Sequence, residues 1–213
     1  MEKKATAIDA LAPAGNLLQH PVGLLRQGGI VVFPTTGLYG LGGDATRSAV
    51  DERVFHIKQR PPEKPVLILV KNRQMAASLV RNVPPVAEAV MKTIWPGGVT
   101  LVMEAAGNLP LNLTAGTGKI GIRIPRHPVA TAILDMLDFP VTGTSANLSG
   151  YPGCSRISRL DTCVADIVDG IVDAGPLKGG TGSTIVDVTG SKPVILREGS
   201  VPAGEIHSVA QGC

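Results

Sequence analysis

The residues best suited to chemistry are basic side chains in a short proline-rich segment. Lys58, Arg60 and Lys64 stand in the sequence KQRPPEK, just beyond a predicted helix. Prolines restrict the backbone, so such a loop has little entropy left to lose when its side chains are held in place. A guanidinium offers a planar fork to phosphate oxygens, and an ammonium acts as a point charge. The segment favours binding of a phosphate, although a solvated basic loop at a helix C-terminus has the same pattern.

A second candidate is the segment 144–150, TSANLSG, which follows a predicted strand. Its hydroxyls, its amide and its backbone N–H groups can surround an oxyanion or a hydroxyl. Ser145 and Ser149 lack the GxSxG context of a nucleophile elbow, and no histidine stands nearby in sequence as a base. The segment indicates binding, with an ordinary polar turn as the alternative.

A third candidate is the segment 29–44, GIVVFPTTGLYGLGGD. A buried strand over 30–33 ends in Thr35 and Thr36, and four glycines follow. Glycine lets the main chain approach a ligand closely, and ligands tend to lie at strand ends in α/β sheets. A glycine-rich turn without a ligand fits the pattern equally well.

Strand ends elsewhere carry further polar side chains. Arg123 lies in IGIRI, on the strand face opposite residues 122 and 124; Ser183 opens one predicted strand, and Arg197 closes the last. Together with the polar segments above, they predict one shared cationic pocket.

Composition excludes several classes of protein. The 213 residues carry a formal net charge of +3, which suits an anionic ligand or weak RNA contact without requiring either. Aromatic residues make up only 3%, so base stacking, typical of single-strand RNA binders, is hardly available.

The three cysteines and four histidines lack metal-ligand spacing, so we predict no protein metal site. No stretch approaches the roughly 18 apolar residues of a membrane span, and the N-terminus lacks the apolar core of a signal peptide, which together predict a cytoplasmic protein.

The order of predicted elements indicates an α/β fold. A helix begins after Thr46 or Ser48, buries Val50, Val54 and Ile57, and ends at the double proline. Further helices are expected at 17–27, 72–80, 86–94, 128–137 and 160–169. Strands are expected at 30–33, 66–70, 99–103, 120–124, 140–142, 170–173, 183–188 and 193–197. This alternation predicts one α/β domain over 1–213, with 1–15 as a mobile lead-in and a twisted mixed sheet flanked by helices.

Seven segments in order carry a resemblance to a known family: FPTTGLYGLGGDA, KQRPPEKPVLILV, WPGGVTLV, GIRIPRHP, TGTSANLSG, STIVDVT and ILREG. Over about residues 17–200 the chain resembles the YrdC family of threonylcarbamoyladenylate synthases, in its short single-domain form. The resemblance implies a twisted mixed sheet with a basic concave face. It also implies synthesis of threonylcarbamoyl-AMP and pyrophosphate from L-threonine, bicarbonate and ATP, with Mg²⁺ carried by the ATP. The product would serve a threonylcarbamoyl transferase complex that modifies position 37 of tRNA.

The resemblance also implies roles for individual residues. Lys58 and Arg60, from its KxR motif, would be the catalytic pair that holds the phosphates. The implied ATP-binding residues are Lys58, Arg60, Lys64, Ser145, Asn147, Gly153 and Arg197. The implied threonine-binding residues are Thr35, Arg123, Gly143 and Ser183.

The chain departs from the family pattern at three positions. Gly37 replaces a second threonine, Leu69 replaces a histidine, and a Thr or Ser is usual near Lys119. Two other functions stay open: an RNA-binding module of the same fold without synthase activity, and a carbamoyl-adenylate-forming domain of hydrogenase maturation. The second normally belongs to a much larger chain with zinc-finger and acylphosphatase-like segments.

Overall fold

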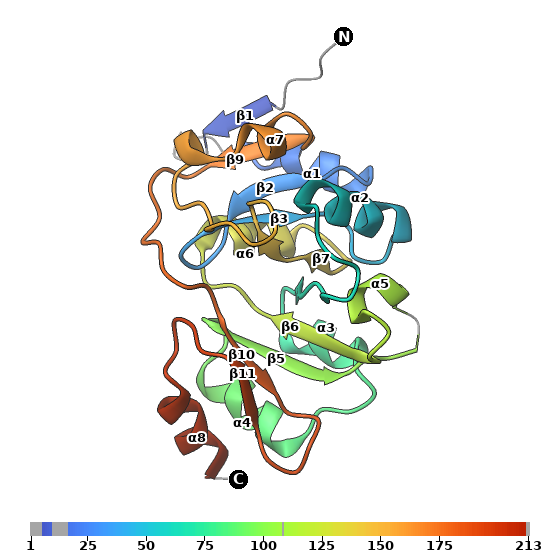
Figure 1. Ribbon diagram of the computed structural model, residues 1–213, viewed down its shortest axis with the longest axis vertical. Helices are drawn as coiled ribbons and strands as arrows, with labels where there is room; N and C mark the ends of the chain where they lie inside the picture. Colours follow the sequence, from blue (N-terminus) through green and yellow to red (C-terminus); the bar gives the residue numbers. More distant parts are fainter. Residues whose placement is uncertain (1–5, 10–16, 108, 212–213) are drawn as a thin grey trace.

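Two mixed β-sheets, one above the other, form the centre of the protein (Figure 1). The computed structural model describes residues 6–9, 17–107 and 109–211. Within the predicted lead-in, Thr6–Asp9 forms strand β1, and the rest of residues 1–15 lies outside the described residues.

The upper sheet has the strand order β1–β9–β2–β3–β8. Its strands are β1 (Thr6–Asp9), β9 (Gly170–Asp173), β2 (Val31–Pro34), β3 (Tyr39–Gly42) and β8 (Thr144–Ser145). Strand β2 runs parallel to β9 and antiparallel to β3, and β3 runs antiparallel to β8. The polar segment around Ser145 is thereby held beside the glycine-rich segment that follows β2.

The lower sheet has the order β11–β10–β5–β6–β4–β7. Its strands are β11 (Val194–Arg197), β10 (Thr184–Asp187), β5 (Val99–Glu104), β6 (Lys119–Arg123), β4 (Ile68–Leu69) and β7 (Val141–Thr142). Strand β5 is parallel to β10 and antiparallel to β6. This register places β5, β6 and β10, which are distant in sequence, side by side in the lower sheet.

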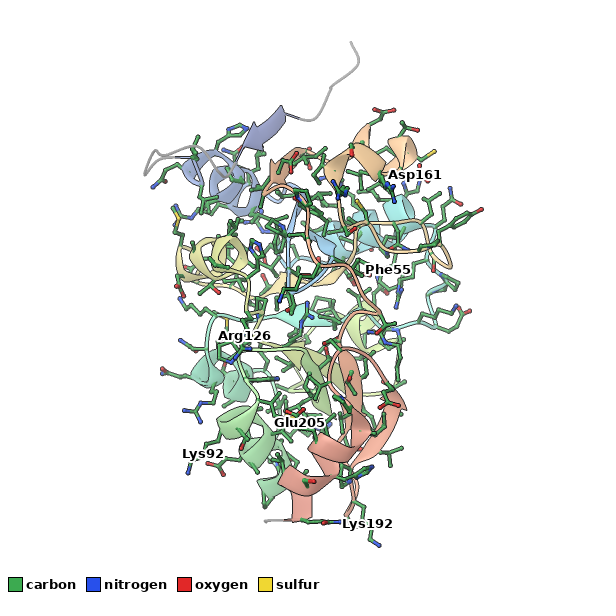
Figure 2. The ribbon with its side chains drawn as sticks, turned by 90° about the vertical axis from the view of Figure 1, so that its left-hand side faces the viewer. Phe55, Lys92, Arg126, Asp161, Lys192 and Glu205 are labelled. Carbon is green, nitrogen blue, oxygen red and sulfur yellow. The ribbon has the colours of Figure 1, made fainter. Side chains whose placement is uncertain are left out.

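Helices cover both faces of the upper sheet but only one face of the lower sheet. Helices α1 (Gln19–Arg26) and α6 (Pro128–Asp135) share a buried apolar cluster with β2, and α2 (Ser48–Lys58) and α7 (Thr162–Ala165) share another on the opposite side. Helices α3 (Arg73–Ser78), α4 (Pro85–Thr93) and α8 (Ala203–Gln211) pack against β5 and β6. Figure 2 shows Lys92 of α4 and Glu205 of α8 in this lower half, with Phe55 of α2 between the halves. The other face of the lower sheet carries the polar residues of the site.

The α/β class and the mixed, helix-flanked sheet structure predicted from the sequence are confirmed, with two sheets in place of one. Gly40 and Gly42, which the glycine-rich turn alternative would have placed in a turn, instead lie in β3, because β2 and β8 offer this strand hydrogen-bonding partners on both sides. Helix α8 was not predicted, and the helix predicted at 160–169 is reduced to α7. Short turns of helix also form at α5 (Leu111–Thr114) and η1 (Ile157–Arg159). Among the described residues, no helix has the length and apolar character needed to cross a membrane.

Helix α2 buries the three apolar residues predicted for it, and also an acid. Asp51 has no exposed surface, and neither carboxylate oxygen has a hydrogen-bond partner among the described residues. Burial, with a smaller contribution from the charge of Glu52, raises the pKa of Asp51 to about 6. The folded state therefore favours the protonated form of Asp51 over the ionised form.

We expect Asp51→Asn to change the pH dependence of stability. Because the pKa is higher in the folded state, the folded protein keeps this proton between about pH 4 and pH 6 while the unfolded chain loses it. Stability is thus lost as the pH rises through that window, by up to about 3 kcal/mol for a shift of this size. The free energy of unfolding of Asp51→Asn relative to wild type should rise by that amount between pH 4 and pH 7, measured by urea titration. Glu63→Gln, an exposed acid outside α2, is the control, and parallel stability curves for wild type and Asp51→Asn would contradict the expectation.

Candidate functional site

A cavity of about 850 Å³ lies between the two sheets. Its walls come from the 35–40 segment, the 60–67 loop, strands β5, β6, β10 and β11, the 143–145 and 151–153 segments, and the 179–183 loop. These include all three segments that the sequence singled out. The predicted shared pocket is therefore present as a geometric feature.

Strand β6 shows how the sequence positions the cationic side chains. Ile120 and Ile122 are fully buried in the lower core, whereas Lys119, Gly121 and Arg123 line the cavity. This is the period of two expected for a strand with one face on the core. The predicted orientation of Arg123, opposite residue 122, is confirmed.

Arg60 reaches the cavity because α2 ends sharply. Gln59 adopts a left-handed conformation with φ of 47°, and the amide of Arg60 donates to the carbonyl of Phe55, which closes the helix. The guanidinium of Arg60 then donates to the carbonyls of Lys64, at 3.0 Å, and Pro65, at 2.8 Å. Two of its five N–H groups are used in this way, and the other three have no hydrogen-bond partner among the described residues and can meet a ligand.

The cavity is strongly cationic. Its lining contains one carboxylate, Asp187, and five cations: Arg60, Lys64, Lys119, Arg123 and Arg197. Asp187 pairs with Lys119 at 2.8 Å, which holds the pKa of Asp187 below its usual value against the effect of its burial. Burial and then repulsion from Arg197 lower the pKa of Arg60 and, to about 10, that of Arg123. An anionic ligand would oppose this lowering of both pKa values, because a nearby opposite charge favours the charged form.

Two buried groups of the cavity wall lack partners in the described part of the chain. They are Nε of Arg123, a residue that is 6% exposed, and the hydroxyl of Thr36. A buried group of this kind left without a partner costs about 1–3 kcal/mol. Their presence in one cavity indicates that a ligand with oxygen acceptors completes the site. Thr36 was not among the sequence-predicted residues, and its adjacency to Thr35 was the available signal.

Thr35 and Ser183 both line the cavity, and their hydroxyls are already engaged. Thr35 donates to the carbonyl of Leu38 at 2.7 Å, and Ser183 lies 2.8 Å from the hydroxyl of Thr100. The oxygen of Thr35 can still accept a hydrogen bond from an amine or hydroxyl.

Lys58 and Asn147 are placed differently from the other predicted residues. Neither lines the cavity, and their exposed fractions are 1% and 8%. Ser145, Lys64 and Arg197 do line it, so only one member each of the KxR and SxN motifs faces the predicted ligand.

Glycines at three positions allow close contacts between neighbouring segments at the cavity. A Cβ on Gly143 would lie 2.5 Å from Cγ of Leu69, and one on Gly153 would lie 2.7 Å from Cδ1 of Leu38. Gly37 accepts a hydrogen bond from the amide of Gly179 at 2.9 Å, and a Cβ on Gly37 would collide with the carbonyl oxygen of Gly179. Glycine at position 37, in place of the threonine of the family pattern, thus leaves room for the 175–182 loop to lie against the segment that contains Thr35 and Thr36. Leu69 is fully buried in the apolar cluster that contains β2, and it does not line the cavity.

We expect Gly37→Ala to separate these two segments. The added methyl group must displace the main chain of Gly179, and this breaks the hydrogen bond between them. Amide hydrogen exchange at residues 179–182 should accelerate about tenfold, which corresponds to the loss of about one hydrogen bond. Gly190→Ala is the matched control, because its Cβ would meet only a carbonyl oxygen at 3.9 Å. Unchanged exchange in Gly37→Ala would show that the loop is held by other contacts.

The cavity lining also includes Lys119 and Tyr151, which the sequence did not assign to the site. Lys119 shares a strand face with Arg123, so the period of β6 could have identified it. Tyr151, 67% exposed, follows the TSANLSG segment and gave no comparable signal. The described residues contain no cluster of three or more His, Cys, Asp or Glu side chains that could hold a metal ion.

Comparison with known proteins adds independent information. The chain is 33% identical over 187 residues to threonylcarbamoyl-AMP synthase of Pyrococcus abyssi, covering 88% of this chain and 55% of that protein. It is 31% identical over 202 residues to the Bacillus subtilis protein of the same name, covering 94% of this chain and 58% of that protein. The Vibrio cholerae protein of that name is 33% identical over 159 residues, with 72% and 85% coverage. The chain thus spans little more than half the length of the first two relatives.

Solved structures agree with the fold. The structure of P. abyssi Sua5 in complex with L-threonine has a TM-score of 0.90 at 30% identity, over 96% of this chain and 60% of that one. Escherichia coli YciO has a TM-score of 0.81 at 28% identity, over 94% and 97% of the two chains. Residues 23–199 match the Sua5/YciO/YrdC family, whose description reads "Telomere recombination". On this match, which covers most of the chain, the protein belongs to the Sua5/YciO/YrdC family.

Proposed function

We propose that this protein is a threonylcarbamoyl-AMP synthase, which converts L-threonine, bicarbonate and ATP into threonylcarbamoyl-AMP and pyrophosphate. The observation that carries the proposal is the cavity itself, in which buried Arg123 lacks a partner for its Nε while four further cations face the same space. A carboxylate and a triphosphate are the anions that this arrangement suits. Relatives of the chain carry the name of this activity, and a neighbouring structure contains L-threonine.

The threonine site would lie around Arg123. Its guanidinium would bind the carboxylate of threonine, while Thr35, Thr36 and Ser183 would contact the amine or the hydroxyl. Gly143 lines the same wall without a side chain. Since Thr35 donates its hydrogen to Leu38, it would act as an acceptor toward threonine.

The triphosphate would lie along Arg60, Lys64, Arg197 and Ser145, with Gly153 in the wall nearby. Mg²⁺ would enter on the phosphates, since it is usually held by one or two carboxylates together with substrate phosphates. These cations would provide the basic concave face expected of the family. Their role is to neutralise charge on the phosphates as the bond to pyrophosphate breaks.

The reaction needs no protein nucleophile. The amine of threonine forms an N–C bond with bicarbonate, or with CO₂ derived from it, and gives a carbamate and water. A carbamate oxygen then attacks the α-phosphorus of ATP, and pyrophosphate leaves with the bridging oxygen. The protein contributes by holding the two anions in contact and stabilising the developing charge. The product would pass to a threonylcarbamoyl transferase complex acting on tRNA.

A pyrophosphate-release assay tests the proposal. The protein, ATP, Mg²⁺ and bicarbonate should release pyrophosphate only when L-threonine is present, and mass spectrometry should detect threonylcarbamoyl-AMP. D-Threonine serves as the matched control substrate. Threonine-independent release, or no release, would refute the proposal. RNA binding that weakens steeply with salt and ignores ATP would favour the RNA-binding alternative.

A further inference from the structure

Lys58 is the last residue of α2, and its side chain points behind the cavity wall. Its ammonium donates to the carbonyls of Ser145, at 2.5 Å, and Asn147, at 2.6 Å, and to Oδ1 of Asn147, at 3.3 Å. An ammonium has three hydrogens, so three acceptors use its full donor capacity. With the residue 1% exposed, Lys58 has neither a free donor nor an open path to a ligand in the cavity.

Asn147 is saturated in the same way. Its amide oxygen accepts from Lys58, and its amide nitrogen donates to the carbonyls of Leu148, at 2.8 Å, and Tyr151, at 2.5 Å. A primary amide has two hydrogens, and both are used. Asn147 is therefore occupied by its own turn.

These bonds hold the turn 145–151 from behind. The main chain adds a hydrogen bond from the amide of Ser149 to the carbonyl of Lys58, at 2.8 Å, and one from Ala146 to Tyr39, at 3.0 Å. On the other side of the turn, Ser145 and Tyr151 line the cavity. The position of these two residues depends on the bonds made by Lys58 and Asn147.

We infer that Lys58 and Asn147 are positioning residues, which act as one buried unit to hold the 145–151 turn against the nucleotide instead of touching it. The inference rests on the proposed function for the identity of the ligand. It revises the direct phosphate contact that the KxR and SxN motifs suggested for both residues.

The cost of burying Lys58 supports this role. Burial, followed by repulsion from Arg60, lowers the pKa of Lys58 to about 7. A buried cation is weak evidence for stability, and in some proteins it is retained because it specifies one arrangement of its partners. Here the partners are three oxygens of a single turn, so the charge selects one conformation of that turn.

A double-mutant cycle tests the inference. Lys58→Met, Asn147→Ala and the double variant are compared by kcat/KM for ATP and by calorimetric titration with ATP in the absence of threonine. Each single change should lower kcat/KM about thirtyfold through a higher KM for ATP, with the KM for threonine unchanged. Because both residues support one turn, the double variant should lie within about threefold of the weaker single variant.

The matched control pairs Lys58→Met with Arg197→Ala, whose effects should multiply, since Arg197 reaches the cavity from β11 and shares no hydrogen-bond partner with Lys58. Multiplicative losses for Lys58→Met and Asn147→Ala, of about a thousandfold together, would identify two separate ligand contacts and overturn the inference. If Lys58→Met does not fold, Lys58→Arg takes its place in the same cycle with the same criterion.

The two readouts separate this inference from the proposed function. If the wild type binds ATP but releases no threonine-dependent pyrophosphate, the proposed function fails and the calorimetric cycle still decides between positioning and contact. Absence of ATP binding in the wild type would overturn both.

Discussion

Replacing Arg123 with methionine is expected to lower kcat/KM for L-threonine about a hundredfold or more while making the unliganded fold more stable. The loss follows because removal of one partner from a buried, hydrogen-bonded charge pair costs about 2–5 kcal/mol. The gain follows because Arg123 is 6% exposed and its Nε lacks a partner in the described structure, so the free protein bears the cost of an uncompensated cation. Methionine fills a similar volume without that charge and should raise the free energy of unfolding by about 1 kcal/mol.

The two measurements are steady-state kinetics with varied threonine and urea unfolding without ligand. Arg123→Lys is the matched variant, since it keeps a cation but loses the planar fork, and it should fall between wild type and Arg123→Met in activity. A variant that loses both activity and stability would show that Arg123 supports the fold. A loss of activity together with a gain in stability is expected only of a residue whose partner is the ligand.

The sequence predicted much of the site because strand ends and loops carry their chemistry locally. The period of two in IGIRI was sufficient to place Arg123 on the face opposite the core, and the double proline was sufficient to end α2 near Lys58. Hydrophobic pattern and chain-breaking residues act over a few neighbours, so they can be read from a short segment.

Features that depend on distant pairing could not be predicted in this way. Residues YGLG within the GLYGLGG stretch form strand β3 because β2 and β8 flank them, and Ser145 of β8 is 105 residues from Gly40, its register partner. The same reason explains why the sequence alone cannot show where the ammonium of Lys58 points. Its acceptors lie 87 and 89 residues away, and a lysine in a basic loop has the same sequence pattern whether its ammonium faces a cavity or a turn.

Conversion of Arg60 to alanine is expected to lower kcat/KM for ATP about tenfold to a hundredfold, and to leave the KM for threonine unchanged. The guanidinium is held by the carbonyls of Lys64 and Pro65, so it meets the triphosphate with little further loss of side-chain freedom. One charge-assisted hydrogen bond contributes about 1.5–3 kcal/mol, which corresponds to this range. Steady-state kinetics with varied ATP measure the effect.

Arg60→Lys separates charge from geometry. Lysine retains the positive charge but cannot bond both carbonyls and a phosphate through a rigid fork, so it should recover only part of the lost activity. The effect should also depend on salt, because a contact with phosphate weakens as ionic strength rises, and the difference between wild type and Arg60→Ala should shrink accordingly. If Arg60→Ala kept full kcat/KM for ATP while folded, the triphosphate would have to lie elsewhere in the cavity. Arg197 would be the next residue to replace, because its guanidinium lines the same wall and its charge is what lowers the pKa of Arg60 after burial.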